Sequence, residues 1–109
     1  MFARCVTMQL KPKMTAQFKQ TMESDILPVL KRQQGFHDEL VLMSPDGREA
    51  IGISLWDSQQ HAEAYSQQSY GEIKRKLSNV TESAPTVKTY DVSLTSVQRQ
   101  TAKGGGTTS

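Results

Sequence analysis

The sequence predicts an α+β fold of the ferredoxin-like type, a four-stranded antiparallel sheet with helices on one face. Two observations lead to this prediction. First, the hydrophobic period changes along the chain in the order strand, helix, strand, strand, helix pair, strand, which is the βαββαβ order of this fold. Second, residues 36–57 form a β-hairpin pattern, because two alternating runs flank the turn residues Pro45, Asp46 and Gly47.

The first strand is predicted over residues 2–10, where side chains alternate with a period of two. Pro12 ends this strand, since proline has no amide hydrogen to give to a strand ladder. The helix that follows has an apolar residue at every fourth position from Met14, and Pro28 is expected to kink it. Gly35 then suits the C-terminal cap that leads into the hairpin.

A three-residue turn between Ser44 and Arg48 sets the predicted hairpin register. Asp38 then lies opposite Ser54, and this strand face consists of Phe36, Asp38, Leu40, Leu42, Ala50, Gly52, Ser54 and Trp56. The other face carries Val41, Met43, Ile51, Ile53 and Leu55. Both faces are partly apolar and the helices can cover only one, so we expect a second copy of the sheet to cover the other in a homodimer.

The chain after the hairpin predicts two short helices and a last strand. The first helix begins at the capping residues 57–60 and the second at Ser69, which opens a capping box. The last strand is expected over residues 86–97. We therefore divide the chain into one domain, residues 1–97, and a disordered polar tail, residues 98–109.

Composition narrows the classes of function. The 109 residues carry a net charge of only +2, so we expect no nucleic-acid partner. The single cysteine, Cys5, allows no disulfide within the chain and no cysteine-based metal site. No stretch is apolar and long enough for a signal peptide or a membrane span, and a cytoplasmic location is the default expectation.

Four sequence segments stand out: LKPK at 10–13, ILPVLKRQQGF at 26–36, SLWDS at 54–58 and AEAY at 62–65. Together they resemble the antibiotic biosynthesis monooxygenase domain of the dimeric α+β barrel superfamily. The resemblance extends over residues 2–94 and implies a ferredoxin-like fold and a homodimer formed through sheet faces. That family includes cofactor-independent oxygenases that act on phenols and quinols, and also haem-degrading oxygenases.

The sequence departs from the catalytic pattern of that family. Catalytic members pair an Asn with the Trp, and the haem-degrading members add a His on a helix. The only Asn is Asn79, late in the second helical region, and the residue four before Trp56 is Gly52. This departure argues against haem degradation and weakens the interpretation as a phenol oxygenase.

Small residues beside Trp56 predict a ligand pocket, because they leave space next to one large aromatic ring. The pocket is expected to comprise Phe36, Asp38, Leu40, Gly52, Ser54, Trp56 and Tyr65. Trp56 would stack on a planar ligand, Asp38 would be a general base and His61 would relay protons. Each has a structural alternative: Trp56 as a core residue, Asp38 bonded to Ser54 or Arg4, and His61 as a surface or capping group.

Two functions remain from the sequence. The first is a cofactor-free monooxygenase that deprotonates an acidic aromatic substrate of the phenol or quinol type, which then reacts directly with oxygen. The second is a non-catalytic dimeric module that binds a small apolar ligand or has a structural role. No cofactor is expected in either case, and no metal, because His37 and His61 have no third ligand at a suitable spacing.

Overall fold

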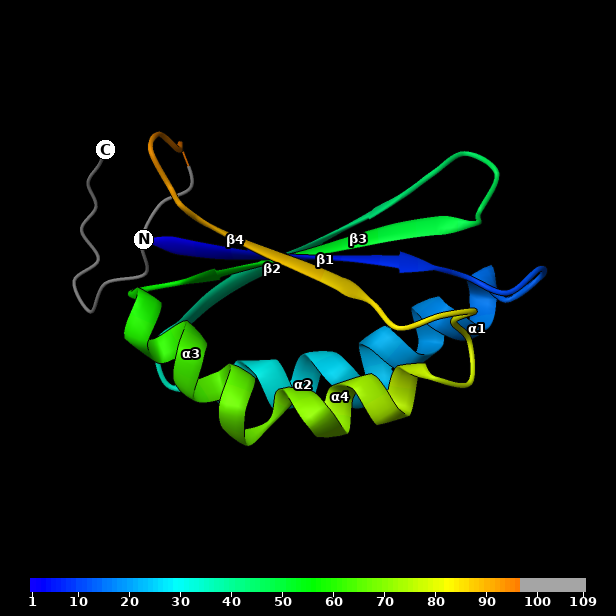
Figure 1. Cartoon of the computed structure of the whole chain (residues 1–109), viewed down its shortest axis with the longest axis horizontal. Coiled ribbons are helices and arrows are strands. Elements are labelled where there is room, and N and C mark those ends of the chain that lie inside the picture. The colour runs from blue at the N-terminus through cyan, green and yellow to red at the C-terminus, as the bar shows by residue number, and fades with distance from the viewer. Residues whose placement is uncertain (97–109) are drawn as a thin grey trace.

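The computed structural model describes residues 1–96, so the domain boundary predicted at residue 97 and the predicted tail 98–109 lie outside the described residues. The elements are β1 (Phe2–Gln9), α1 (Thr15–Thr21), the π-helical segment η1 (Met22–Ile26), α2 (Leu27–Lys31), β2 (Phe36–Met43), β3 (Glu49–Trp56), α3 (Gln59–Gln68), α4 (Tyr70–Leu77) and β4 (Thr86–Asp91). The strands form one antiparallel sheet in the order β2-β3-β1-β4, with the helices on one face (Figure 1). The predicted ferredoxin-like α+β fold is confirmed.

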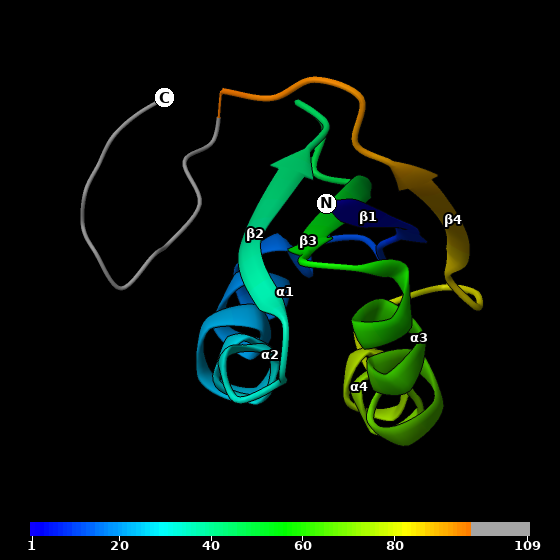
Figure 2. The same cartoon turned by 90° about the vertical axis from the view of Figure 1, so that its left-hand side faces the viewer.

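The helices form two separate arms beneath the sheet (Figure 2). One arm is the run α1, η1 and α2, whose predicted apolar stripe is buried at Phe18, Met22, Ile26 and Leu30. The expected effect of Pro28 takes the form of a π-helical turn directly before it, since proline gives α2 no amide hydrogen at its second position. The other arm is α3 and α4.

Ser58, within the predicted capping segment 57–60, caps α3, and its Oγ accepts a hydrogen bond from the His61 N–H at 3.2 Å. The capping box predicted at Ser69 does not form, because the Ser69 side chain makes no capping bond. Ser69 also ends α3, where its N–H donates to the Tyr65 carbonyl oxygen at 2.9 Å, and its ψ of −24° is far from the extended conformation of a capping residue. The last strand, predicted over 86–97, ends earlier, at Asp91.

The hairpin connection has four residues, one more than predicted. Ser44 pairs with Glu49, whose carbonyl oxygen accepts the Ser44 N–H at 2.9 Å. Gly47 takes the expected left-handed conformation, with φ of +74°. Arg48 leaves the hairpin ladder because it bonds to the chain after β1: its carbonyl oxygen accepts the Leu10 N–H at 2.7 Å, and its Nε donates to the Leu10 carbonyl oxygen at 2.9 Å.

One extra residue in the connection reverses the faces of β2, because strand side chains alternate. Glu39 lies opposite Ser54 and faces the helices. Asp38 pairs with Leu55 and Leu40 pairs with Ile53. The side chains of Asp38 and Leu40 therefore lie on the side of the sheet away from the helices. The predictions that placed Asp38 and Leu40 on the face of Ser54 are therefore wrong.

A β-bulge at the start of β2 shifts the pairing of β2 with β3 by one residue. The pairing shifts between Phe36 and Asp38, so that Phe36 lies opposite Trp56 as predicted. The extra residue is His37, whose Nε2 lies 2.9 Å from Asp57 Oδ1. The bulge therefore keeps the aromatic pair at one end of the hairpin while the rest of β2 presents its alternate residues to the helices.

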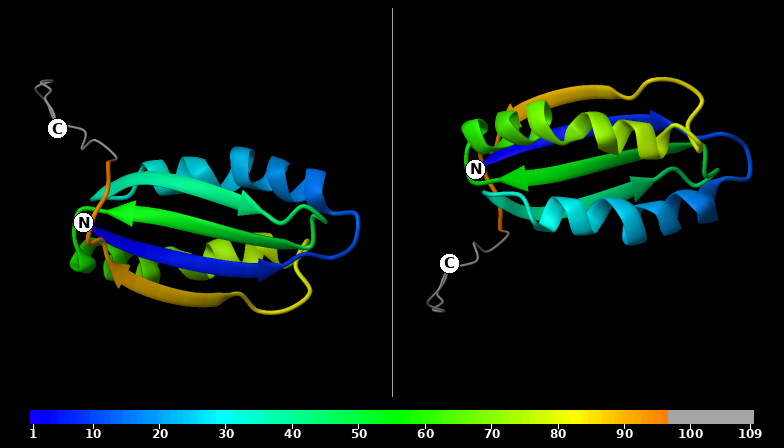
Figure 3. Two further views of the ribbon diagram at one scale, coloured as in Figure 1. Left: turned by 90° about the horizontal axis from the view of Figure 1, so that it is seen from above. Right: turned by 90° about the horizontal axis from the view of Figure 1, so that it is seen from below.

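The second face of the sheet is uncovered in the single chain (Figure 3, left). Its centre is the half-buried row Ile51, Ile53 and Leu55 of β3. Exposed apolar side chains flank this row, with Leu40 56% exposed and Tyr90 52% exposed. Within residues 1–96, no helix has the length and apolar character needed to cross a membrane.

Candidate functional site

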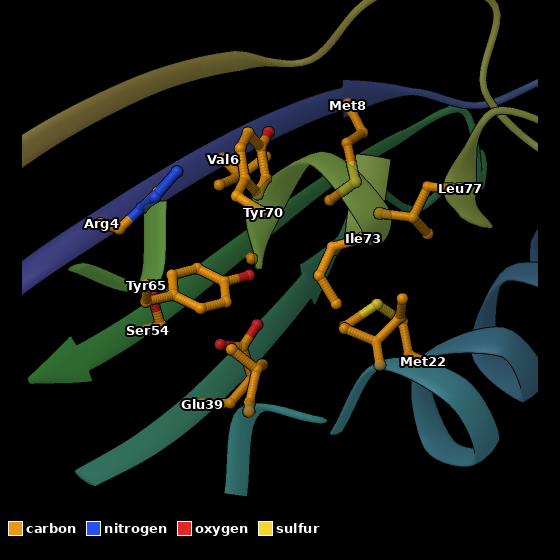
Figure 4. A pocket seen from close by; sticks show the side chains of 13 residues that line it. Arg4, Val6, Met8, Met22, Glu39, Ser54, Tyr65, Tyr70, Ile73 and Leu77 are labelled. Atoms are coloured by element: carbon orange, nitrogen blue, oxygen red, sulfur yellow. The ribbon is translucent and has the colours of Figure 1, made fainter. Parts of the chain in front are cut away.

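A cavity of about 40 Å³ lies between the sheet and the two helical arms (Figure 4). Its polar lining residues come from five elements. They are Arg4 of β1, Glu39 of β2, Ser54 of β3, Tyr65 of α3 and Tyr70 of α4. Apolar side chains form the rest of the lining, among them Met8, Met22, Ile73 and Leu77. The cavity thus combines an apolar wall with one acid, one cation and three hydroxyl groups.

Glu39 reaches into the cavity over Gly52. A Cβ added at Gly52 would lie 3.0 Å from Glu39 Oε2, so the missing side chain gives the carboxyl group its room. Burial raises the pKa of Glu39 to about 8, and the nearby Arg4 charge only partly opposes this effect. A carboxyl group with such a pKa exists in both protonation states near neutral pH, as a group that exchanges protons with a ligand requires.

Arg4 is 3% exposed, which is unusual for a cation. Its guanidinium carbon lies 4.5 Å from the centre of the Tyr70 ring and 5.3 Å from that of the Tyr65 ring. These cation–π contacts hold the charge, yet Nε has no hydrogen-bond partner. Arg4 therefore brings a positive charge and an unused donor to the cavity.

Tyr65 and Tyr70 form the α3–α4 side of the cavity. The Tyr70 hydroxyl is buried without a hydrogen-bond partner. Burial raises the pKa of both phenols, so both are neutral at physiological pH. In Figure 4 the Tyr65 hydroxyl and the Glu39 carboxyl group point toward one another across the cavity.

Trp56 lies behind Tyr65 and does not line the cavity. It is fully buried, and its Nε1 donates to Ser54 Oγ at 2.9 Å. Its ring stacks on Tyr65 with centroids 4.9 Å apart and meets the Phe36 ring edge-on at 5.5 Å. The interpretation of Trp56 as a core residue is confirmed. Trp56 packs against Tyr65, and Phe36 packs against Trp56, both outside the lining of the cavity.

The other predicted site residues lie elsewhere. Asp38 is exposed on the opposite side of the sheet from the cavity. His61 packs against Gly35, which has φ of +81°, and its Nδ1 lies 3.1 Å from Ser58 Oγ. His61 therefore belongs to the start of α3 rather than to the cavity. In the part of the chain that the structure describes, no group of three or more His, Cys, Asp or Glu side chains is close enough to hold a metal ion.

Of the predicted pocket, the structure brings together Gly52, Ser54 and Tyr65. The cavity also contains Arg4, Glu39 and Tyr70, which were not predicted as site residues. A signal for Arg4 was present, because it is the one charged residue among the alternate apolar positions of the first strand. Glu39 could not be found in this way, since its side of the sheet depends on the length of the hairpin connection.

Comparison with solved structures shows the same fold in several proteins. A monooxygenase from the gene ActVA-Orf6 of Streptomyces coelicolor, in complex with nanaomycin D, has a TM-score of 0.74 and 16% identity, with 89% of this chain and 91% of that chain covered. SnoaB, a cofactor-independent oxygenase from Streptomyces nogalater, has a TM-score of 0.69 and 14% identity, covering 89% and 97%.

A third similar structure is NE2512, a protein of unknown function from Nitrosomonas europaea, with a TM-score of 0.75, 13% identity and coverage of 91% and 95%. No family model and no curated protein matches the sequence. The chain therefore has the α+β fold found in antibiotic biosynthesis monooxygenase structures, as the sequence resemblance implied. At these identities the likeness defines the fold, and the chemistry has to be argued from the cavity.

Proposed function

We propose that this protein binds a small phenol or quinol in the cavity and oxygenates it without a cofactor, as a member of the antibiotic biosynthesis monooxygenase family. The observation that carries the proposal is the half-buried Glu39 carboxyl group, which faces the cavity beside the Arg4 cation. Glu39 takes the role of general base that was predicted for Asp38. The fold shared with an oxygenase described as cofactor-independent supports the same reaction class.

The proposed reaction begins when the Glu39 carboxylate takes the proton of the phenolic hydroxyl. The electron-rich ring carbon of the resulting anion then bonds to molecular oxygen and forms a hydroperoxide. Loss of water leaves a quinone, with one oxygen atom of O₂ retained as the new carbonyl and the other released in the water. The substrate supplies all the electrons, so no external reductant is needed.

Entry of a ring into the cavity requires side-chain movement. A volume of about 40 Å³ accommodates a few water molecules, whereas ligand pockets usually measure about 300–1,000 Å³. Met8 and Met22 line the cavity, and methionine side chains adapt readily because they are unbranched and have three rotatable bonds. Tyr70 also lines the cavity and is only half-buried, so a movement of its side chain would enlarge the cavity for an aromatic ligand.

Oxygen consumption with a panel of quinols and polyphenols, in metal-free buffer, tests the reaction. The wild-type protein should consume oxygen with at least one of them, and Glu39→Gln should lower the rate by about 10²–10⁴-fold, as expected for loss of a general base. Glu63→Gln, an exposed substitution on α3, is the matched control and should retain the full rate. Equal rates for wild type and Glu39→Gln would remove Glu39 from the reaction.

One observation favours the second function, a binding module without turnover. The Trp56 indole N–H is already bonded to Ser54, so it is not available to a substrate. If phenols bind in the cavity but no member of the panel consumes oxygen above the buffer rate, the protein is such a module.

We further propose that two copies pair through the uncovered sheet face. This face is apolar along β3, and exposed apolar residues such as Leu40 and Leu42 surround it. Patches of this kind are rare on monomers, and a second copy of the same face covers them with two-fold symmetry.

Sedimentation at micromolar concentration should give about twice the 12.2 kDa chain mass. Ile53→Asp should dissociate the pair, because it places a charge at the centre of the apolar face. Ala64→Asp, on the exposed side of α3, is the control and should leave the mass unchanged. A wild-type monomer, or a dimeric Ile53→Asp variant of unchanged stability, would contradict this interface.

A further inference from the structure

Arg4 is a buried cation whose hydrogen-bonding capacity is partly unused. Its Nε has no acceptor, and within residues 1–96 the side chain takes part in no ion pair. A buried N–H donor without an acceptor lowers stability, as does a buried charge without a counter-charge. Such a group is typical of a site that an acceptor oxygen or an anion occupies.

The Tyr70 hydroxyl is a second buried polar atom without a partner, on the same side of the cavity. The Arg4 guanidinium lies 4.5 Å from the centre of the Tyr70 ring, and Figure 4 shows the two side by side next to β1. A phenolic hydroxyl can donate one hydrogen bond. The Arg4 guanidinium is close enough to the Tyr70 hydroxyl to oppose the effect of burial on the pKa of that phenol, yet Arg4 Nε and the Tyr70 hydroxyl make no hydrogen bond of full geometry. Each group thus keeps a donor hydrogen for one acceptor oxygen of a ligand.

The positive charge of Arg4 also has no negative charge in the cavity to balance it. Burial raises the pKa of Glu39 to about 8, so near neutral pH this carboxyl group is largely protonated and does not neutralise Arg4. The lining residues of the other packed elements add no charge, since Tyr65 and Tyr70 stay neutral and η1, α2 and β3 contribute only uncharged side chains. A ligand with one negative charge therefore suits the cavity.

We propose that the cavity holds its phenolic ligand as the phenolate, whose ionised oxygen accepts hydrogen bonds from Arg4 Nε and the Tyr70 hydroxyl. This inference rests on the proposed phenol binding and adds the residues that hold the oxyanion. The proton is accounted for in either route: a neutral phenol gives it to the Glu39 carboxylate, or a phenolate from solution meets Glu39 already protonated. The ligand class is thus an acidic phenol, with its ring against the apolar wall.

The test uses 4-nitrophenol, whose phenolate absorbs visible light, and 4-nitroanisole, which has nearly the same shape and no acidic proton. The wild-type protein should bind 4-nitrophenol at least about tenfold more tightly than it binds 4-nitroanisole. At about pH 6, where most of the free probe is protonated, binding should increase the phenolate absorbance, since a neighbouring cation lowers the pKa of a bound acid.

Two variants assign the effect to the named side chains. Arg4→Met should abolish the rise in phenolate absorbance, and Tyr70→Phe should weaken 4-nitrophenol binding several-fold. Both should bind 4-nitroanisole as the wild type does, which shows that the cavity is intact. If Arg4→Met does not fold, Tyr70→Phe, which removes one oxygen atom, still decides the question.

The outcomes separate this inference from the proposed function. Equal wild-type affinities for the two probes would overturn phenolate binding and leave phenol binding standing. A phenolate signal that is unchanged in the variants would overturn the roles of Arg4 and Tyr70. If neither 4-nitrophenol nor 4-nitroanisole binds, both the phenolate inference and the proposed phenol binding are overturned.

Discussion

At a pH above about 8, the Glu39→Gln variant should have a free energy of unfolding about 3–5 kcal/mol higher than that of the wild type. Burial raises the pKa of this carboxyl group from 4.5 to about 8. Its contribution to stability is therefore fully present below about pH 4.5 and is lost as the pH rises through about 8, where the native state holds a buried carboxylate. Gln does not ionise, so the variant avoids this loss.

Urea unfolding followed by circular dichroism at about pH 4, 7 and 9 measures the effect. The stability difference between the variant and the wild type should be small at the lowest pH and should widen at each step. Glu63→Gln on the exposed side of α3 should stay within about 0.5 kcal/mol of the wild type throughout. A difference for Glu39→Gln that does not grow with pH would show that the carboxyl group is solvated.

Trp56→Ala should lower the free energy of unfolding by about 3–5 kcal/mol, the usual cost of removing a buried aromatic side chain. Trp56 is 0% exposed, and its loss would leave a cavity between Phe36 and Tyr65. It would also remove the hydrogen bond donated to Ser54 Oγ.

The same urea titration measures this loss, with Leu94→Ala as the control. Leu94 is 92% exposed, so its truncation should change the stability by less than about 0.5 kcal/mol. A Trp56→Ala variant that keeps its stability but loses binding of 4-nitroanisole would contradict the assignment to the core and place Trp56 against the ligand.

Local sequence patterns were sufficient to predict the order and type of the elements. Strand alternation in β3 and the four-residue repeat from Phe18 to Leu30 are properties of short segments, and both patterns keep their buried faces in the structure. The apolar content of both hairpin faces also indicated an uncovered sheet surface, which the structure shows along Ile51, Ile53 and Leu55. These predictions succeeded because the spacing of apolar residues within one strand or helix indicates which of its side chains are buried.

The hairpin register was decided by tertiary contacts. Turns of three and four residues both suit Pro45 and Gly47, so local chemistry does not fix the connection. Arg48 extends the connection because Leu10, far away in sequence, binds both its carbonyl oxygen and its Nε, while Glu82 Oε2 accepts from its Nη2 at 2.7 Å. None of these contacts can be read from residues 36–57 alone.

The candidate site depends on this register. With one residue fewer in the connection, Asp38 would face the helices; with Arg48 outside the ladder, Glu39 does. The structure then places Glu39 over Gly52 and brings Arg4 and Tyr70 from two other elements to the same cavity. Strand period specifies which residues share a face, but only long-range contacts decide which of the two faces meets the helices, because a one-residue slip exchanges them.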